Sequence, residues 1–304
     1  MAELDLDLSG TTVALVGGDR REQEIARRAA LTGATVRAFG FPWPDAGIAG
    51  VEAASTPRDA LAGARFALFP IPGIAKDGGL FAPAVAPDRI IPDADLLSVM
   101  AANAHIILGA ADKDLNAAAE QHGIGLHEYE WDVRLMLLRG PAIIEGVIKV
   151  IVENTDRTIH ANPVCVVGQG TIGTLLTRTL VLLGAHTYVA ARNPVQRAAA
   201  HAMGAQALPL EELPALAEGL DIVLSTVPAP VVGPNVIARL PDHALVVDLA
   251  APPGGVDLEA AEARGLKAVW ARGRGGRAPV TVGASQWSGI AERIAAILAE
   301  DAQG

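Results

Sequence analysis

Residues 162–173 read Asn-Pro-Val-Cys-Val-Val-Gly-Gln-Gly-Thr-Ile-Gly, an apolar run followed by three glycines with the spacing G-x-G-x-x-G. A glycine loop with this spacing, placed between a strand and a helix, is typical of a dinucleotide-binding turn. The glycines allow a tight turn, a close approach of the backbone to a pyrophosphate, and close packing of helix on strand. Backbone N–H groups at the start of the helix then face the phosphates. We therefore predict cofactor contacts at the following residues: Gly168, Gly170, Thr171, Ile172 and Gly173.

Short apolar runs and helical segments alternate on both sides of this loop. The apolar runs are nearly continuous rather than alternating with polar residues, as expected for strands that are buried on both faces. Strands that alternate with helices predict parallel sheets covered by helices. The fold class is therefore α/β, with two Rossmann-like domains and a cleft between them, which is the default location for a substrate. The expected strands lie within residues 11–19, 34–41, 64–73, 104–110, 162–170, 185–193, 221–228, 244–250 and 267–273.

The length of 304 residues exceeds what one hydrophobic core usually serves, so two domains are expected. Residues 1–140 are expected to form a flavodoxin-like or Rossmann-like substrate domain, and residues 141–284 the dinucleotide-binding domain. A helix that starts with Pro141 at its first position is expected to bridge them. The amphipathic helix expected at residues 285–304 could pack on the first domain.

Composition excludes several classes of partner. A formal net charge of -10 argues against nucleic acids and anionic membranes. No apolar run reaches the roughly 18 to 20 residues that span a bilayer. The first ten residues lack a basic segment and a long apolar run, so no secretory signal is expected, and a soluble, cytoplasmic protein is. The single cysteine, Cys165, lies in an apolar run and is expected to be a buried structural residue.

The end of the second strand of the dinucleotide-binding domain indicates which cofactor is bound. An NAD site places a carboxylate there for the ribose 2′-hydroxyl, but residues 190–193 read Ala-Ala-Arg-Asn. Arg192 offers a planar, permanently charged group for a 2′-phosphate, which favours NADP. The alternative is a solvated arginine at a strand end.

Two later strands of the same domain also end in candidate cofactor contacts. In a doubly wound sheet the carboxyl ends of the strands line the dinucleotide crevice. Thr226 and Val227, followed by Pro228, are expected near the ribose or adenine, and Asp248 and Ala250 near the nicotinamide. Plain loop geometry is the alternative for each.

Three residues are candidates for the chemistry. Glu145 lies on the expected bridging helix and could be a general acid or base, or a surface glutamate. Asp19, after the glycine turn of the first domain, could relay a proton or cap a helix. Arg277, in a glycine-rich loop with two further arginines at residues 272–279, could hold a substrate carboxylate or be a solvated basic residue.

A metal site is not expected. Two histidines and two glutamates between residues 122 and 130 match no familiar ligand spacing and lie in an expected loop. They are His122, His127, Glu128 and Glu130.

Several short motifs, in order along almost the whole chain, resemble the A subunit of dipicolinate synthase. As a set they are more specific than the glycine loop alone. They are Gly17-Gly18-Asp19 with Arg21, Glu145-Gly146, Thr155-Asp156, Thr158-Ile159-His160, and Asp248-Leu249-Ala250 followed by Pro253-Gly254-Gly255.

The resemblance implies an NADP-dependent oxidoreductase that converts 4-hydroxy-tetrahydrodipicolinate to dipicolinate (pyridine-2,6-dicarboxylate). It also implies a role in sporulation, a flavoprotein-like partner (the B subunit of dipicolinate synthase), and an oligomer. NADP would accept a hydride, and arginines would hold the two carboxylates of the cyclic imino acid. Two alternatives stay open. One is another NADP-dependent dehydrogenase or reductase of a keto acid or cyclic imino acid. The other is a non-catalytic NADP-binding component of a flavoprotein complex.

Overall fold

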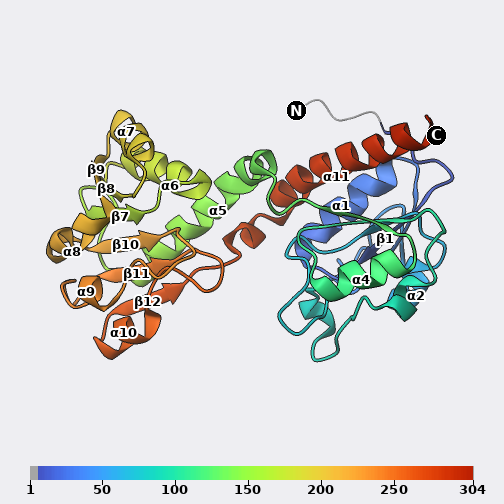
Figure 1. Cartoon of the computed structure of the whole chain (residues 1–304), viewed down its shortest axis with the longest axis horizontal. Helices are drawn as coiled ribbons and strands as arrows, with labels where there is room; N and C mark the ends of the chain where they lie inside the picture. Colours follow the sequence, from blue (N-terminus) through green and yellow to red (C-terminus); the bar gives the residue numbers. More distant parts are fainter. Residues whose placement is uncertain (1–5, 304) are drawn as a thin grey trace. The chain divides into compact units, whose positions relative to one another are not determined.

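A computed structural model describes residues 6–303 of the chain. It consists of two compact α/β units, one at each end of the view in Figure 1. The first unit comprises the residues up to Arg139 together with those from Ala278 onward, and the second comprises Gly140–Arg277. The expected fold class, two Rossmann-like domains with parallel sheets, is confirmed.

The first unit is built on a six-stranded parallel sheet with the order β3-β2-β1-β4-β5-β6. One face of its central strands packs on α2, α3 and α4, while α1 and α11 lie together on the other face (Figure 1). The strands are β1 (Thr12–Val16), β2 (Thr35–Phe39), β3 (Val51–Ala53), β4 (Phe66–Leu68), β5 (His105–Leu108) and β6 (Gly125–Glu128). The helices are α1 (Arg20–Leu31), α2 (Pro57–Leu61), η1 (Pro83–Val85), α3 (Ala94–Leu97), α4 (Lys113–Gln121) and α11 (Pro279–Asp301).

The second unit repeats this plan with the strand order β12-β11-β10-β7-β8-β9. Residues of α5, α6 and α7 form a buried cluster with one face of its sheet, and residues of α8, α9 and α10 with the other. The strands are β7 (Pro163–Val167), β8 (His186–Ala190), β9 (Gln206–Leu208), β10 (Ile222–Ser225), β11 (Leu245–Asp248) and β12 (Lys267–Trp270). The helices are α5 (Val133–Asn154), α6 (Thr171–Leu182), α7 (Pro194–Ala202), η2 (Leu210–Glu212), α8 (Leu213–Leu216), η3 (Ala217–Gly219), α9 (Pro234–Ile237), α10 (Leu258–Ala263) and η4 (Arg274–Arg277).

Both sheets reverse their strand order beside the first strand of the unit. The reversal lies between β1 and β4 in the first unit and between β7 and β10 in the second. In doubly wound sheets a ligand binds at such a point, outside the carboxyl ends of the strands. The two units therefore offer comparable places for a ligand, and the residues of their turns must distinguish them.

The strands that the sequence does not predict are at or next to the sheet edges. They are β3, β6 and β9, and the loop expected at residues 122–130 is wrong where β6 pairs in parallel with β5. These strands have three or four residues and are partly exposed. An edge strand that is half polar lacks the continuous apolar run by which a central parallel strand is recognised.

Helix α5 starts earlier than the sequence predicts. Pro141 was expected at the first helical position, but it lies inside a helix that begins at Val133. The carboxylate of Asp132 accepts a hydrogen bond from the backbone N–H of Leu135 at 3.1 Å and so supports the true start. Proline has no N–H to donate to the preceding turn, so Pro141 marks a weak point of this helix, and the boundary between the units falls beside it.

Helix α11 returns the chain to the first unit, where it runs along α1 (Figure 1). It begins at Pro279, so residues 279–284, expected in the second domain, form its first turns. A Cβ atom added to Gly283 would lie 2.6 Å from the backbone oxygen of Arg21, so glycine is needed for the close approach of the two helices. Proline is well suited to the first position of a helix.

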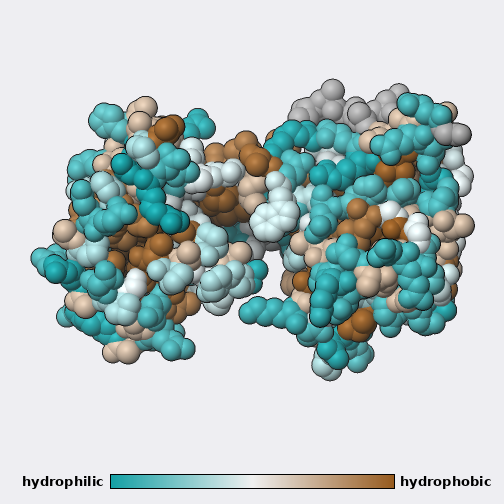
Figure 2. All heavy atoms as spheres, viewed as in Figure 1, coloured by the Kyte–Doolittle hydropathy of each residue, from teal (hydrophilic) through white to brown (hydrophobic). Residues whose placement is uncertain are grey.

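The cores are apolar, and hydrophilic residues cover most of the first unit on the face drawn in Figure 2. Cys165 is fully buried in β7, and burial raises the pKa of its thiol to about 12. A thiol with this pKa stays protonated at neutral pH, as the structural role requires. Within residues 6–303, no helix combines the length and the apolar character needed to cross a membrane.

Candidate functional site

The glycine loop of the second unit connects β7 to α6, and close contacts fix two of its glycines. Gly168 has a φ of +93°, and a Cβ atom there would lie 2.6 Å from the side chains of Thr226 and Val227. A Cβ atom on Gly173 would lie 2.2 Å from the backbone oxygen of Gly168. Gly170 differs, because no atom described beyond its chain neighbours lies within 4 Å of such a Cβ. The loop is closely packed on the protein side and open above Gly170.

The N-terminus of α6 has no side-chain cap in the described structure. Its N-cap residue is Gly170, which has no side chain to accept hydrogen bonds from the first turn. The first N–H groups of a helix need acceptors from outside the helix, and anions are favoured there by the helix dipole. The backbone of Thr171 and Ile172 is thus available to a phosphate, which supports the fit of a dinucleotide to this loop.

Gln169 is a site residue that sequence reasoning missed. Its side chain is buried, and its Oε1 accepts a hydrogen bond from the Thr177 hydroxyl at 2.8 Å. Its Nε2 is buried without a partner in the described structure. The middle position of a glycine motif carries no sequence signal, so only the structure reveals this tie between the loop and α6.

The end of β8 carries two arginines rather than one. Arg192 is exposed, and Asn193 caps α7 by accepting from the backbone N–H of Val195 at 2.8 Å. Arg197, in the first turns of α7, donates from Nη1 to the backbone oxygens of Ala191 and Arg192 at 2.8 and 2.7 Å. This turn concentrates positive charge where the sequence predicts a 2′-phosphate contact at Arg192. Arg197 was missed because the distance along the chain hides its return to the strand end.

The residues after β10 support the glycine loop. The hydroxyl of Thr226 donates to the backbone oxygens of Val167 and Gly168 at 3.1 and 3.4 Å. Val227 packs against the Gly168 position, and Pro228 is exposed. The expectation that Thr226 and Val227 lie near the dinucleotide loop agrees with this geometry, and direct contact with ribose or adenine stays a prediction.

Asp248 and Ala250, expected near the nicotinamide, have their polar groups occupied within the protein. The Asp248 side chain is 1% exposed and accepts hydrogen bonds from the backbone N–H groups of Ala250, Gly255 and Val256. The backbone oxygen of Ala250 accepts from the Trp270 indole at 3.1 Å. These residues shape the loop after β11, which leaves the carboxylate no free oxygen for a ligand.

Two of the candidate catalytic residues meet in the second unit. Glu145 on α5 forms an ion pair with Arg277 in η4, and both side chains are well exposed. A Cβ atom on Gly146 would lie 2.6 Å from Cβ of Arg274 and 2.8 Å from its backbone oxygen. Gly146 therefore lets the arginine-rich loop lie directly against α5, and this close approach brings Arg277 to Glu145.

Asp19, the third candidate, caps α1 in the first unit. Its carboxylate accepts from the backbone N–H of Arg21 at 2.9 Å and forms two further hydrogen bonds with the Arg21 guanidinium at 2.8 Å. Glu22 completes a capping box by accepting from the backbone N–H of Asp19 at 2.7 Å. This is the capping role that the sequence leaves open beside proton transfer.

Glu22 and Tyr129 form part of a buried ionisable group that sequence reasoning missed. Burial raises the pKa of Glu22 to about 7, against the lowering effect of the Arg21 guanidinium, while Glu22 also accepts from the backbone N–H of Ile71 at 3.2 Å. Burial likewise raises the pKa of the Tyr129 hydroxyl, and the charge of Glu22 adds to this effect. The spacing of Asp19 and Glu22 is a capping-box signal, which could have identified Glu22.

The histidines and glutamates of residues 122–130 each have a separate partner. His122 contacts the backbone oxygen of Ala94 at 2.8 Å, and His127 contacts the ring of His105 at 3.1 Å. Glu128 accepts from the backbone N–H of Ala111, and Glu130 pairs with Arg139. In the part of the chain that the structure describes, no group of three or more such side chains is arranged to hold a metal ion.

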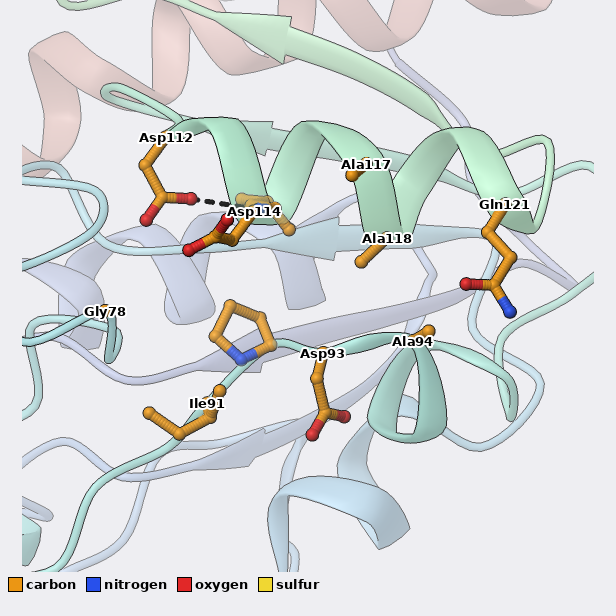
Figure 3. Close-up of a pocket in the computed structure, with 11 residues that line it drawn as sticks. Gly78, Ile91, Asp93, Ala94, Asp112, Asp114, Ala117, Ala118 and Gln121 are labelled. Atoms are coloured by element: carbon orange, nitrogen blue, oxygen red, sulfur yellow. Dashed lines mark hydrogen bonds between the residues drawn. The ribbon is translucent and has the colours of Figure 1, made fainter.

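A pocket of about 270 Å³ lies in the first unit, beside α3 and α4 (Figure 3). Its acidic side chains belong to the starts of these helices. Asp93 accepts from the backbone N–H of Leu96 at 2.8 Å, and Asp112 accepts from that of Leu115 at 2.9 Å. These aspartates therefore act as helix caps, and the pocket is separate from the glycine loop.

The class of protein follows from the doubly wound sheets and the open glycine loop. Residues 150–269 match the family model described as shikimate / quinate 5-dehydrogenase. Solved structures of the same fold include the transhydrogenase of Sinorhizobium meliloti, with a TM-score of 0.65 and 18% identity over 90% of this chain and 87% of that one. The chain is an oxidoreductase of the dehydrogenase type that uses a nicotinamide cofactor.

The particular resemblance extends over nearly the whole chain. Residues 12–130 match the family model for the N-terminal domain of the A subunit of dipicolinate synthase. The A subunit of the Bacillus subtilis (strain 168) enzyme is 28% identical over 296 residues, 97% of this chain and 99% of the relative. The crystal structure of its counterpart from Bacillus halodurans has a TM-score of 0.86 and 28% identity, covering 95% of this chain and 99% of that one. The resemblance to the A subunit of dipicolinate synthase is thus confirmed.

Proposed function

We propose that this chain is an NADP-dependent oxidoreductase that converts 4-hydroxy-tetrahydrodipicolinate to dipicolinate. The similarity to the A subunit of dipicolinate synthase over 97% of the chain supports this substrate class. The reaction removes one water, one hydride and one proton from the ring and makes it aromatic, so the oxidative direction is favoured. A nicotinamide ring, when bound, supplies the hydride acceptor.

The observation that carries the cofactor assignment is the uncapped start of α6. Gly170 has open space where a side chain would be, and the N–H groups behind it have no side-chain acceptor in the described structure. We assign the pyrophosphate to the backbone of the glycine loop and of Thr171, Ile172 and Gly173. Helix N-termini of this kind bind anions through their N–H groups and dipole.

The choice of NADP over NAD rests on the turn after β8. Arg192 is exposed there, and Arg197 is held beside it through the backbone oxygens of Ala191 and Arg192. A guanidinium group binds a phosphate with charge-assisted, often paired hydrogen bonds. We therefore assign the 2′-phosphate to Arg192, with Arg197 adding positive charge and holding the turn.

Glu145 and Arg277 are the proposed residues for the substrate. The Glu145 side chain is 64% exposed, so it can exchange protons with solvent, and Arg277 at 42% exposure can reach a carboxylate. In this proposal Arg277 binds a ring carboxylate and Glu145 takes or returns a proton. Asp19 remains a second candidate for proton transfer, although its capping bonds favour a structural role.

The remaining features of the proposal come from the relatives. The Bacillus subtilis relative is named as one lettered subunit of a synthase, which supports a second one for this chain. We propose a flavoprotein-like partner, a role in sporulation and a cytoplasmic location. The first unit, which matches the N-terminal domain of that family, is the proposed substrate domain. The second unit, with the glycine loop, is the proposed NADP domain.

The test combines the purified chain with NADP and freshly condensed aspartate semialdehyde and pyruvate. Absorbance at about 340 nm reports the reduced cofactor, and dipicolinate is followed at its own ultraviolet band. A parallel reaction with NAD is the cofactor control. We expect both signals to rise with NADP. If neither rises, even after the flavoprotein-like partner is added, the substrate assignment is wrong; NADP binding without turnover would then favour a non-catalytic, cofactor-binding component.

A further inference from the structure

Asp248 is a buried carboxylate that holds a loop in place. It ends β11, its side chain is 1% exposed, and three backbone N–H groups point at its two oxygens. Oδ1 accepts from Ala250 at 2.9 Å, while Oδ2 accepts from Gly255 at 2.7 Å and from Val256 at 3.1 Å. A buried carboxylate requires such donors, because it has lost its hydration. The segment 249–256, here called the β11 loop, is therefore folded around this side chain.

Two glycines make this arrangement possible. Gly254 has a φ of +94°, and a Cβ atom there would lie 2.6 Å from Oδ2 of Asp248. A Cβ atom on Gly255 would lie 2.2 Å from the Ser225 hydroxyl and 2.3 Å from the backbone oxygen of Val227. The β11 loop can therefore close on the carboxylate and on the end of β10 only with glycine at both positions.

The β11 loop is joined to the segment 226–232 after β10, here called the β10 loop. The backbone oxygen of Gly255 accepts from the N–H groups of Val231 and Val232 at 3.1 and 2.9 Å. At its other end, the β10 loop reaches the glycine loop through the Thr226 hydroxyl, which donates to the backbone oxygen of Val167 at 3.1 Å. A continuous set of hydrogen bonds and close contacts thus links Asp248 to the dinucleotide loop.

The place of these loops in the sheet indicates which part of the cofactor they serve. The reversal of strand order lies between β7 and β10, so β7, β8 and β9 form one mononucleotide half, and β10, β11 and β12 form the other. The glycine loop and Arg192 lie in the first half, where the adenosine 2′-phosphate is assigned. The β10 and β11 loops lie in the half that remains for the nicotinamide.

We propose that Asp248 is a positioning residue for the nicotinamide half of the cofactor site. It does not touch the cofactor, because its oxygens are bound by the backbone; it sets the shape of the β11 loop and, through Gly255, of the β10 loop. This inference rests on the proposed binding of a nicotinamide dinucleotide. Asp248→Asn replaces one oxygen by an NH₂ group that cannot accept from the N–H it faces, so the loop loses part of its support.

The test compares a whole dinucleotide with its adenosine half. NADPH and 2′,5′-ADP are titrated against wild type, Asp248→Asn and a control, Asp221→Asn. Asp221 precedes β10 at the opposite edge of the same sheet and pairs with Arg157 and His243, so the control removes a partly buried carboxylate remote from the loops. We expect Asp248→Asn to weaken NADPH by about tenfold to hundredfold. Binding of 2′,5′-ADP, and of both ligands to Asp221→Asn, should stay within about twofold.

The outcomes separate this inference from the proposed function. Wild type that binds neither ligand refutes the proposed function, and the cofactor role of Asp248 falls with it. Wild type that binds both, with NADPH affinity unchanged in Asp248→Asn, refutes the positioning role alone. Equal weakening of both ligands also refutes it, because a general loss of structure does not select the nicotinamide half.

Two further measurements guard against a variant that folds poorly. Hydrogen exchange of residues 249–257 without ligand should be faster in Asp248→Asn than in wild type, with β7 and β8 unchanged. Gly255→Ala keeps Asp248 but pushes the loop away from Ser225, so it should show the same selective loss of NADPH binding. If Gly255→Ala binds NADPH as wild type does, the shape of the loop does not matter and the inference is wrong.

Discussion

The two units have the same strand order, yet their first βα turns end in opposite ways. The turn from β1 to α1 is closed by its own carboxylates, because Asp19 caps the helix and Glu22 completes the capping box. The turn from β7 to α6 has Gly170 at the N-cap and no side-chain cap in the described structure. The N–H groups of α1 already have anionic acceptors, while those of α6 do not.

The space around the turns differs in the same sense. A Cβ atom on Gly18 would lie 2.3 Å from the carboxyl carbon of Glu22, so this side chain fills the room above the first turn. Above Gly170 the corresponding room is open to 4 Å. The comparison teaches that the topology provides a possible anion site in each unit, and that the cap decides which one is free for a phosphate.

The largest effect is expected from giving the second turn the cap of the first. Gly170→Asp places a carboxylate where the pyrophosphate would lie, so NADPH binding should weaken by about a thousandfold, roughly 4 kcal/mol. Gly170→Asn is the matched variant, since it adds a cap of the same size without the charge. Isothermal titration calorimetry measures both. If the Asp and Asn variants bind NADPH equally, charge at this position is irrelevant and the comparison loses its basis.

A pH-dependent effect is expected from Glu22. Its pKa is about 7 in the folded protein and ordinarily 4.5, so between these values the folded state holds a proton that the unfolded chain has released. Stability of the first unit should therefore fall as pH rises from 4.5 to 7, and ionised Glu22 costs up to about 3 kcal/mol above that range. Glu22→Gln, which cannot ionise, should remove this fall.

The measurement is urea unfolding at pH 5 and pH 8, followed by hydrogen exchange of α1. Glu52→Gln, an exposed residue of β3 in the same unit, is the control and should keep the pH dependence of wild type. An unchanged pH dependence in Glu22→Gln would show that Glu22 ionises in the folded protein at its ordinary pKa.

A smaller effect is expected from Arg192 and concerns the choice of cofactor. Arg192→Ala should weaken NADPH by about tenfold and leave NADH within about twofold, because only NADPH carries the 2′-phosphate. Fluorescence titration with each cofactor gives the ratio of affinities. Arg239→Ala, at an exposed arginine of the same unit paired with Glu218, should leave both unchanged. Equal weakening of NADPH and NADH by Arg192→Ala would remove the basis for naming NADP.

The smallest effect is expected from the cap of α1 itself. Asp19→Ala removes the cap and the ion pair with Arg21 and should lower the free energy of unfolding of the first unit by about 1 to 2 kcal/mol. Asp19→Asn keeps an acceptor for the backbone of Arg21 and should cost less. The two variants are compared by thermal unfolding. An Asn variant as unstable as the Ala variant would mean that the charge of Asp19, not the cap, stabilises the turn.

Sequence patterns were sufficient for the parts of this fold that are buried and continuous. The central strands and the glycine loop were predicted because parallel strands are apolar throughout and the glycine spacing has steric causes. Strands β3, β6 and β9 were missed because edge strands are short and partly polar. The true start of α5 was missed because Pro141, a frequent first residue of helices, lies in its interior.

The candidate site was only partly predictable, because a side chain's partner is set by three-dimensional contacts. The sequence offers Asp248 and Thr226 as strand-end residues, but only the structure reveals that they bind backbone groups of the neighbouring loops. Glu145 and Arg277 were singled out separately, and close packing at Gly146 brings them together. The capping-box spacing of Asp19 and Glu22 was present in the sequence and could have predicted that the first turn is closed.

The stoichiometry of NADPH binding tests the contrast between the two turns most directly. Calorimetric titration of wild type should give one site per chain, and Gly173→Val should abolish it, because a side chain at Gly173 collides with the backbone of Gly168. Gly219→Ala, at a position in the same unit with no described contact within 4 Å, is the control and should bind as wild type does. Two sites per chain, or one site that survives Gly173→Val, would contradict the assignment of the cofactor to the second unit alone.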